Sequence, residues 1–451
     1  MTTGSSTSTD YHAALAALTA RGRFGIRLGL GRTRALLREL GDPQLALRGA
    51  LVAGTNGKGS VLALAGSVLR AAGLRVGETP KPHLVSYRER VVIDGHPIGV
   101  PDFTRHVEAV LEVADRVARH HGEPTEFEML TAVVFRHFAE AGLDVALVEV
   151  GLGGRLDATH AWDGGVAVVT NVALDHMDRL GPTIATIARE KAAIIERDDL
   201  AVTGAEGEAL EIVRRRARRV GAPLTVVEPA PVLGWDRDGL EVELSRLGPT
   251  RIGLRGRHQA ANVAVADALL DALEAAGIAR ADDAARRSGY ANAAWPGRLE
   301  LLDVGGVEVL LDGAHNPAGA AALAQALDDL RPYVAPGPLT LVVASMADKD
   351  VDGVIDGLAR SGAIRGATVV ATTVDAARAM PAADLAARWR ARDVGAAAVL
   401  EDSDAIEALG LALARARGAS GMTVVAGSLY LVGAVRAHLV DNPELRDPPS
   451  S

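Results

Sequence analysis

The segment Gly54–Ser60, which reads GTNGKGS, combines residue types that bind a phosphate group. It follows a short apolar run and precedes an Ala- and Leu-rich helical pattern over Val61–Ala72. A strand, a glycine turn and a helix start in this order direct backbone N–H groups and the positive end of the helix towards an anion. Lys58 can reach the outer phosphates of a nucleotide, and the Ser60 hydroxyl can ligate Mg²⁺.

The spacing of this segment departs from the usual phosphate-binding loop, G-x-x-x-x-G-K-[ST]. The first glycine stands too close, and Gly59 separates Lys58 from Ser60. The segment therefore indicates an unusual class of P-loop. The alternative is a glycine-rich turn without a ligand, but the flanking strand and helix favour the phosphate site.

Composition and charge limit the class of protein. The 451 residues are 48% hydrophobic and 23% charged, a balance typical of a globular chain long enough for two or three domains. A net charge of -9 argues against nucleic-acid binding through bulk charge, and the lack of cysteine excludes disulfides and thiolate metal sites. Because the sequence has neither a signal-peptide pattern at Met1–Asp10 nor an apolar run of membrane-span length, we expect a soluble cytoplasmic protein.

Apolar strand-like runs alternate with helical patterns along the chain. This alternation predicts an α/β protein whose parallel sheets carry helices on both faces. Residues 223–255 instead show short β-like pieces with Gly and Pro turns, which predict an antiparallel edge or a small subdomain. The strand candidates are 49–53, 145–150, 166–170, 307–311, 340–344, 368–372 and 423–426.

Two polar groups follow neighbouring strand candidates, where ligands of open α/β sheets bind. Glu149 lies at the end of one candidate and offers hard carboxylate oxygens that suit Mg²⁺. His176 follows the next candidate and could ligate a metal or contact phosphate. Taken singly, Glu149 could be a solvated residue at a turn, and a lone histidine is more often a structural residue.

Lys191 lies in a helical pattern that begins near Thr183. A lysine in such a pattern is ordinarily a solvated cation. Among acidic metal ligands its amine has a second option, because reaction with CO₂ gives a carbamate, which is an anionic oxygen ligand for a second Mg²⁺. The residues alone leave both interpretations open.

Gln259 and Asn262 stand three residues apart in a predicted helix and so share one face. Two amide side chains on one face suit a nucleotide base or ribose. Ordinary polarity of a helix surface is the alternative.

A second strand-to-helix corner is predicted near residue 312. Asp312 ends a strand candidate, and Pro317 can occupy the first turn of the next helix, which places His315 at the same corner. Arg298 follows the apparent linker 295–297 and is placed to bridge two domains and meet phosphate. Asp312 could equally be a turn residue.

Taken together, these motifs are more specific than any one of them. The chain resembles the folylpolyglutamate synthase/dihydrofolate synthase family of Mur-type ATP-dependent amide ligases. The resemblance runs from about Gly25 to Gly433, which is nearly the whole chain. The matching segments are GTNGKGS, PHLVSYRERVVIDG, EVGLGGRLDAT, TNVALDHMDRLG, REKAAI, GRHQAAN, WPGRLE, DGAHNP, DKD at 348–350 and GSLYLVG at 427–433.

The resemblance implies a P-loop Mur-ligase-type ATPase and acceptor-binding domain over 1–296 and a smaller Rossmann-like α/β domain over 297–440, with ATP between them. The polar tail 441–451 is expected to fray. The implied catalytic residues are Lys58, Lys191 in carbamylated form, and His315. The implied ATP-binding residues are Thr55, Asn56, Gly57, Lys58, Gly59, Ser60, Gln259, Asn262, Arg298 and Asp312. The implied ligands of two Mg²⁺ ions include Ser60, Glu149 and His176. The residues implied to bind a pterin- or folate-like acceptor are His83, Thr125, Glu126, Phe127, Glu128, Leu156, Asp157 and Ala158.

The implied reaction is the activation of an acid by ATP. The acceptor carboxylate attacks the γ-phosphate, and the amine of L-glutamate then attacks the acyl phosphate to give an amide, ADP and phosphate. Only small molecules are expected as partners, with no nucleic acid and no membrane, and the protein is expected to be a monomer.

Lys81 is a departure from the family pattern. The family usually has T-S-P-H-L here, with the Ser as a Mg²⁺ ligand, whereas this chain has Pro80-Lys81-Pro82-His83-Leu84. An ammonium group has no lone pair for a metal, so Lys81 alters the metal arrangement, the acceptor or both. Lys81 keeps open the alternative of a Mur-type ligase acting on a non-folate acid. A nucleotide-binding protein without ligase activity is an alternative of a different class.

Overall fold

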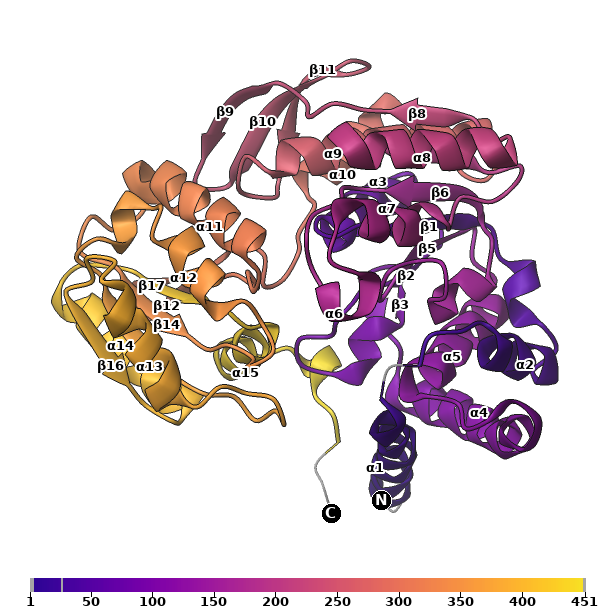
Figure 1. Cartoon of the computed structure of the whole chain (residues 1–451), viewed down its shortest axis with the longest axis horizontal. Coiled ribbons are helices and arrows are strands. Elements are labelled where there is room, and N and C mark those ends of the chain that lie inside the picture. Colours follow the sequence, from indigo (N-terminus) through magenta and orange to yellow (C-terminus); the bar gives the residue numbers. More distant parts are fainter. Residues whose placement is uncertain (1–3, 26, 449–451) are drawn as a thin grey trace. The chain divides into compact units, whose positions relative to one another are not determined.

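The computed structural model describes residues 4–25 and 27–448, which form two compact units (Figure 1). The first unit comprises the described residues up to 229 together with 261–290 and 443–448, and the second comprises 230–260 and 291–442. The division differs from the expected boundary at 296/297, because residues 230–260 and 291–296 belong with the later part of the chain.

Contacts around Asp329 explain why residues 230–260 join the second unit. The Arg257 guanidinium donates to both carboxylate oxygens of Asp329 at 2.8 Å and lies 3.8 Å from the centre of the Trp235 ring. The Trp235 indole N–H donates to the Asp329 carbonyl at 3.2 Å. The stretch 230–260 is therefore tied to the helix that carries Asp329.

The first unit is built on an eight-stranded sheet with the order β4-β3-β2-β5-β1-β6-β7-β8. The pairs from β2 to β8 are parallel, and β3 and β4 form an antiparallel edge. Parallel order aligns the carboxyl ends of β5, β1 and β6 at one edge. The strands are β1 (Gly49–Ala53), β2 (Val76–Thr79), β3 (Val92–Ile93), β4 (His96–Pro97), β5 (Val145–Glu149), β6 (Gly165–Val169), β7 (Leu200–Thr203) and β8 (Leu224–Val226).

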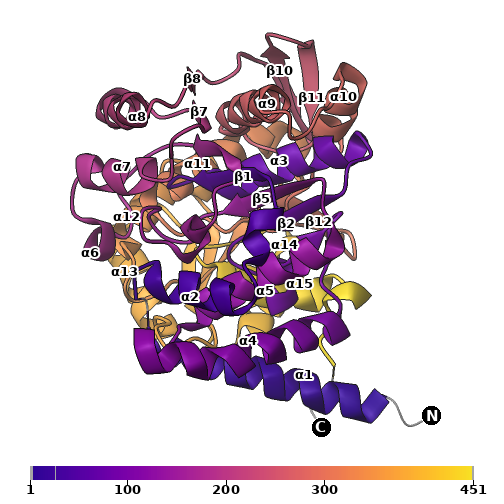
Figure 2. The ribbon, with the colours of Figure 1, turned by 90° about the vertical axis from the view of Figure 1, so that its right-hand side faces the viewer.

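Helices cover both faces of this sheet. On one face α3 contacts β1, β2 and β5, and Ser67 of α3 donates to the Gly289 carbonyl of α10 at 2.7 Å. On the other face α4 and α5 pack together, and α1 lies along α4 (Figure 2). The helices are α1 (Gly4–Thr19), α2 (Gly31–Glu39), α3 (Lys58–Ala71), α4 (Val100–His121), α5 (Glu126–Ala141), α6 (Met177–Leu180), α7 (Ile184–Ala192), α8 (Gly207–Val220), α9 (Gln259–Ala275) and α10 (Asp283–Ala291).

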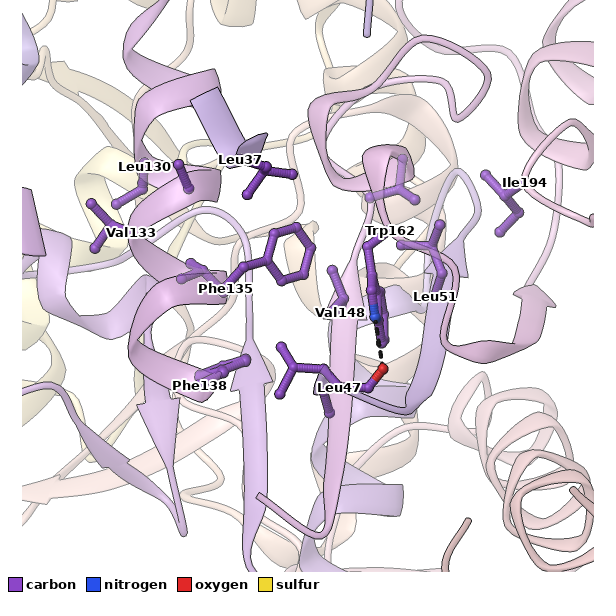
Figure 3. Packing of buried hydrophobic residues seen from close by; sticks show 14 of the residues in the cluster. Leu37, Leu47, Leu51, Leu130, Val133, Phe135, Phe138, Val148, Trp162 and Ile194 are labelled. Atoms are coloured by element: carbon purple, nitrogen blue, oxygen red, sulfur yellow. Dashed lines mark hydrogen bonds between the residues drawn. The ribbon is translucent and has the colours of Figure 1, made fainter. Parts of the chain in front are cut away.

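The core of the first unit lies between the sheet and α5. Alternate strand residues such as Leu51 and Val148 face this core, as a period of two requires. The rings of Phe135 and Trp162 stand 5.7 Å apart beside Val148 (Figure 3). The Trp162 indole N–H donates to the Leu47 carbonyl at 3.2 Å, so the buried ring keeps its hydrogen bond.

The second unit has a six-stranded sheet with the order β12-β13-β17-β14-β15-β16, and a separate three-stranded antiparallel sheet, β11-β10-β9. All pairs of the larger sheet are parallel except β12 with β13. The strands are β9 (Val232–Asp236), β10 (Gly239–Leu244), β11 (Gly248–Ile252), β12 (Glu300–Val304), β13 (Val307–Leu311), β14 (Thr340–Val343), β15 (Thr368–Ala371), β16 (Ala398–Glu401) and β17 (Thr423–Ala426). The helices are α11 (Pro317–Leu330), α12 (Val351–Leu358), α13 (Ala382–Arg392), α14 (Ala405–Gly418) and α15 (Leu429–Leu439).

The α/β class and every strand candidate are confirmed, and the antiparallel pieces expected within 223–255 are β9–β11. Short strands such as β7 and β16 were not predicted. Within the described ranges, no helix combines the length and the hydropathy that a membrane span requires.

The predicted fraying of the tail is wrong for its described part. Residues 443–448 belong to the first unit, where Arg88 donates to the carbonyls of Glu444 and Arg446. Backbone carbonyls bound to a buried guanidinium hold this polar segment in place. Residues 449–451 of the predicted tail lie outside the described residues.

Candidate functional site

The glycine loop lies between β1 and α3. Gly57 precedes the helix with φ 82°, a conformation that favours glycine, and a Cβ there would stand 2.2 Å from Asn262 Oδ1. At Gly54 an added Cβ would stand 1.8 Å from the Thr170 hydroxyl oxygen. Both glycines therefore allow neighbouring segments to approach the loop backbone, and Asn262 of α9 lies beside the predicted phosphate site.

The segment after β6 holds the glycine loop in shape. The Asn56 N–H donates to Asn171 Oδ1 at 2.9 Å, and the Thr170 hydroxyl donates to the Asn56 carbonyl at 2.6 Å. The Ala173 N–H donates to the Thr55 hydroxyl at 3.0 Å. Sequence reasoning singled out only His176 in this segment and missed Thr170 and Asn171. Their position directly after a buried strand was the available signal.

Two lysine ammonium groups converge on one carbonyl oxygen of the loop. Lys58 Nζ donates to Gly54 O at 3.0 Å, and Lys191 Nζ donates to the same oxygen at 2.8 Å. Burial, together with the positive charge of Lys58, lowers the pKa of Lys191 to about 7. A large fraction of Lys191 is therefore a neutral, nucleophilic amine near neutral pH.

The predicted helix around Lys191 is confirmed. Thr183 caps α7, and its hydroxyl accepts a hydrogen bond from the Thr186 N–H at 3.2 Å. Lys191 lies in the last turn and is only 5% exposed, so it is not a solvated surface cation. The helix directs its side chain towards Gly54.

Glu149 lies at the carboxyl end of β5, level with Val52 of β1. Its Oε1 is 3.9 Å from Lys58 Nζ, and its Oε2 accepts a hydrogen bond from the Lys81 N–H at 2.9 Å. The predicted carboxylate and the P-loop lysine therefore lie together. Ser60 is in the first turn of α3, which begins at Lys58 and so earlier than the pattern predicted from Val61.

The donor set fits a magnesium ion that shares its ligands with a nucleotide. Within the ranges that the structure describes, no cluster of three or more His, Cys, Asp or Glu side chains is arranged to hold a metal ion. Mg²⁺ commonly takes one or two protein oxygens and completes its coordination with phosphate and water. Glu149 and Ser60 supply that kind of partial set.

His176 stands in a different environment from Glu149. It has φ 50°, it precedes the short helix α6, and its ring is 3.9 Å from the Asp175 carboxylate with a side chain that is 45% exposed. A non-glycine residue in this conformation is uncommon and often functional. Its role as a metal ligand stays a prediction.

Lys81 lies inside the predicted acceptor region. Its ammonium group hydrogen-bonds to the Glu149 carbonyl and lies 4.8 Å from the centre of the Phe127 ring. Burial is the main cause that lowers the pKa of Lys81 to about 8. A cavity of about 10 Å³, enough for one water molecule, adjoins these groups. Its lining residues are Thr79, Lys81, Arg90, Phe127, Leu130, Thr131, Val134, Phe135, Val148 and Thr159.

Several predicted acceptor residues also serve the local backbone. Thr125 and Glu128 form a capping box at the start of α5, and Arg32 donates to both oxygens of Glu128. Asp157 accepts hydrogen bonds from the N–H groups of Leu152 and Thr159, which closes the loop that also contains Leu156 and Ala158. These contacts shape the acceptor region, and substrate contacts by these residues stay predictions.

His83, Tyr87 and Arg90 form a second group beside the cavity. Arg90 Nε donates to His83 Nδ1 at 2.8 Å, and the His83 and Tyr87 rings are 4.3 Å apart. Burial and the Arg90 charge lower the pKa of His83 to about 3, so this ring is neutral at physiological pH. The Tyr87 hydroxyl donates to Glu126 Oε1 at 3.0 Å.

A larger cavity of about 250 Å³ adjoins the glycine loop. Asn171 and Asn262 both line it. Asn171 accepts a hydrogen bond from the Asn56 N–H, and Asn262 lies beside Gly57. A cavity of this size that begins next to a phosphate loop has room for part of a nucleotide. The lining residues are Thr170, Asn171, Val172, Gly204, Glu206, Val227, Glu228, Pro229, Ala261 and Asn262.

In the second unit the predicted corner is confirmed. Asp312 follows β13, and its two oxygens accept hydrogen bonds from the N–H groups of Leu299 and Ala314, both at 2.9 Å. His315 Nδ1 lies 2.8 Å from the Gly313 carbonyl, and a Cβ at Gly313 would stand 1.9 Å from Arg298 Nη1. Arg298, Asp312 and His315 therefore lie together.

Two further predicted ATP-binding residues of this unit are Asp312, which is buried, and Gln259, which begins a helix. Burial raises the pKa of Asp312, although the positive charge of Arg298 opposes the shift. Gln259 is the first residue of α9, and its Nε2 is 3.1 Å from His258 Nε2. The predicted helix that joins Gln259 and Asn262 is confirmed.

The fold and the site define a class of protein, namely a P-loop α/β protein of the Mur-ligase type. Residues 52–270 match the family model described as Mur ligase middle domain, and residues 299–438 match the one described as dihydrofolate synthetase, C-terminal domain. A dihydrofolate synthase/folylpolyglutamate synthase from Bacillus subtilis is 34% identical over 96% of this chain and 99% of its own length. The chain therefore belongs to the dihydrofolate synthase/folylpolyglutamate synthase family of ligases.

Solved structures show the same relationship. The Mycobacterium tuberculosis folylpolyglutamate synthase complexed with ADP and AMPPCP is 32% identical, with a TM-score of 0.84, over 96% of this chain and all of that one. The Escherichia coli FolC in complex with DHPP and ADP is 29% identical, with a TM-score of 0.78, over 94% of this chain and 97% of that one. A Yersinia pestis bifunctional synthase with Mn, AMPPNP and L-glutamate bound is 30% identical, with a TM-score of 0.77, over 94% of this chain and 98% of that one.

Proposed function

We propose that this chain uses ATP to join L-glutamate to dihydropteroate, to a folate, or to both. The observation that carries this proposal is the convergence of Lys58, Lys191 and Glu149 at the glycine loop. The ligands named in the structures of relatives, which are adenine nucleotides, a divalent metal, a pterin compound and L-glutamate, support it. A protein that only binds a nucleotide has no need of this constellation.

The residues of the first unit act on the phosphates and on the acceptor carboxylate. Backbone N–H groups of the glycine loop and the start of α3 hold the phosphates, and Lys58 neutralises charge on the phosphoryl group that moves. The acceptor carboxylate displaces ADP at the γ-phosphorus to give an acyl phosphate. The glutamate amine then attacks the acyl carbon and loses a proton, and phosphate leaves as the amide forms.

Glu149 and Ser60 would hold the divalent metal, with His176 as a further candidate ligand. When bound, such an ion stabilises negative charge on the transferring phosphoryl group. Arg298, Asp312 and the amide pair of α9 stay predicted ATP contacts, and His315 stays a predicted catalytic residue.

Lys191 carries a further step of the proposal. Its neutral amine can attack CO₂ and lose one proton, which forms a carbamate with a new N–C bond and a net negative charge. The short contact with Gly54 O and the lowered pKa of Lys191 support this chemistry. The carbamate would place an anion beside Lys58 at Gly54, which suits a second metal ion.

One observation favours an acceptor acid that differs from dihydropteroate and folate. Lys81 places a positive charge over Phe127 in the predicted acceptor region. A Mur-type ligase that acts on a different acid is therefore the second candidate function, with the same first step at ATP.

A substrate panel tests the proposal. Purified protein is incubated with MgATP, L-glutamate and either dihydropteroate, tetrahydrofolate or unrelated carboxylic acids, and products are identified by mass. We expect phosphate release that depends on both an acid and glutamate, with a glutamyl product from a pterin-type acid. Turnover with only a non-pterin acid would support the second candidate, and light scattering of the same sample tests the proposed monomer.

A further inference from the structure

The segment Pro443–Pro448, here called the tail segment, contacts the region around His83. It lies more than 350 positions away in sequence from Arg88, yet both belong to the first unit. Arg88 is buried, with 4% of its surface exposed, and its guanidinium makes most of its hydrogen bonds to this segment. A buried guanidinium with five N–H donors needs such acceptors.

The tail segment supplies three acceptor atoms to Arg88. Arg88 Nη2 donates to the Glu444 carbonyl at 2.6 Å and to the Arg446 carbonyl at 3.1 Å, and Arg88 Nε donates to Asp447 Oδ1 at 3.2 Å. The same Asp447 oxygen accepts from the Ser86 hydroxyl at 2.7 Å. The Asp447 side chain therefore links the tail segment to the turn 86–90 through Ser86 and Arg88.

This turn is the scaffold of the group beside the small cavity. The Glu89 carboxylate accepts hydrogen bonds from the N–H groups of Leu84, Val85 and Ser86. These three bonds fix the backbone of residues 84–86 around the carboxylate. One residue further on, Arg90 reaches the His83 ring at 2.8 Å. Arg90 and His83 therefore depend on the shape of a turn that the tail segment anchors from outside.

We infer that Asp447 of the tail segment is a positioning residue for acceptor binding, because it holds Ser86 and Arg88 and thereby places His83 and Arg90. This inference rests on the proposed function, which assigns an acceptor to that region. Among the described residues, Asp447 hydrogen-bonds to Ser86 and Arg88, and neither of these is a predicted substrate, nucleotide or metal contact. It acts through the turn, so its loss affects acceptor binding more than ATP binding.

The test uses full-length Asp447→Ala and Asp447→Glu variants. For Asp447→Ala we expect the KM for the pterin-type acid to rise about tenfold, while the KM for ATP changes less than twofold. Asp447→Glu keeps a carboxylate and should recover much of the loss. Glu444→Gln is the matched control, because it removes a tail carboxylate that faces the exposed His96 instead of Arg88, and we expect wild-type constants.

Hydrogen exchange gives a second readout that needs no substrate. The amides of residues 84–86 should exchange about tenfold faster in Asp447→Ala than in the wild type, since the turn loses its anchor. Unchanged exchange there, or an equal rise in the KM for ATP and for the acid, would overturn the inference. Failure of the wild-type protein to extend any pterin-type acid would refute the proposed function instead, and the exchange result would still decide whether Asp447 holds the turn.

Discussion

Lysine is scarce in this chain, which contains only Lys58, Lys81, Lys191 and Lys349 among 48 basic residues. Three of the four lie within the candidate site. Arginine keeps its charge in almost any environment, whereas burial readily lowers the pKa of lysine. Many surface ion pairs use arginine, whereas Lys58, Lys81 and Lys191 lie in the candidate site, where a compact or neutral amine is useful. Lys81 and Lys191 were singled out from the sequence by their motifs, and the scarcity of lysine is a second signal that points to the same residues.

Replacing Lys191 tests the carbamate. We expect Lys191→Ala to lower amide formation by roughly 10²-fold or more, the scale seen when one charge-stabilising group of an active site is lost. Added short carboxylates should restore part of the rate by taking the place of the carbamate. Arg189→Ala, an exposed cation two residues earlier on α7, should behave as the wild type. Full activity of Lys191→Ala would contradict the carbamate role.

Lys81 offers a second test at the scale of one side chain. We expect Lys81→Ser to fold normally and to shift the Mg²⁺ concentration for half-maximal rate, the preferred acceptor, or both, by several-fold. The physical reason is the loss of a buried charge that contacts the Glu149 carbonyl and the Phe127 ring, the latter worth about 0.5–2 kcal/mol. Lys81→Met keeps the chain length and separates charge from volume. Unchanged metal titrations and acceptor profiles in both variants would show that Lys81 is peripheral.

At the scale of elements, helix α3 is flanked by two glycines with positive φ, one at each end. Because their backbone conformations are alike, one can serve as the control for the other. Gly57 has φ 82° and faces Asn262, whereas Gly73 has φ 79° and has no atom within 4 Å of an added Cβ. We expect Gly73→Ala to cost only about 1 kcal/mol in backbone strain and to leave ATP affinity unchanged. Gly57→Ala should also distort the phosphate loop and weaken ATP binding at least tenfold, as measured by calorimetry. Equal ATP affinities for the two variants would refute the inference that a Cβ at Gly57 distorts the phosphate loop.

The elements that could be predicted are those with strong local patterns. β1, β13 and β17 were predicted residue for residue because each is an apolar run between clear turns. β7 and β16 were missed, although β17 is equally short and was found. Their membership in a sheet is decided by neighbouring strands, which the local sequence does not contain.

The site residues that could be predicted from the sequence are those that lie in local motifs. Lys58, Glu149 and Lys191 were found because each follows a strand or lies on a patterned helix, and the structure brings these three together. The roles of Asn171 and Asp447 depend on hydrogen bonds between segments remote in sequence. Such contacts are set by tertiary packing, so residue type and spacing give no direct signal for them.

At the scale of the whole molecule, each unit has its own sheet and its own hydrophobic core. Separate cores allow separate unfolding, and a two-state description need not hold for such a chain. We therefore expect a calorimetric scan with two transitions. A single substitution in one unit should move only the transition of that unit.

Asp199 of the first unit is suited to this test because its carboxyl group is buried, with 2% of the residue exposed. Burial is the main cause that raises the pKa of Asp199 to about 7 from an ordinary 3.8, and the charge of Asp163 adds to it. Between these two values the folded chain keeps a proton that the unfolded chain has released. The free energy of unfolding therefore falls as the pH rises through this window, and the whole cost is present above pH 7.

Asp199→Asn removes this cost, and its amide oxygen can still accept the hydrogen bond from the Glu196 N–H, which is 2.7 Å long in the wild type. We expect the free energy of unfolding of the first unit to rise at pH 8 by up to about 4 kcal/mol, the equivalent of a pKa raised from 3.8 to about 7, with the midpoint of its transition rising accordingly, and to match the wild type near pH 4. Asp198→Asn, on the exposed neighbour, should show no such pH-dependent gain. A gain that is the same at both pH values, or a shift of both transitions together, would mean that Asp199 does not titrate in the folded first unit or that the two units unfold as one.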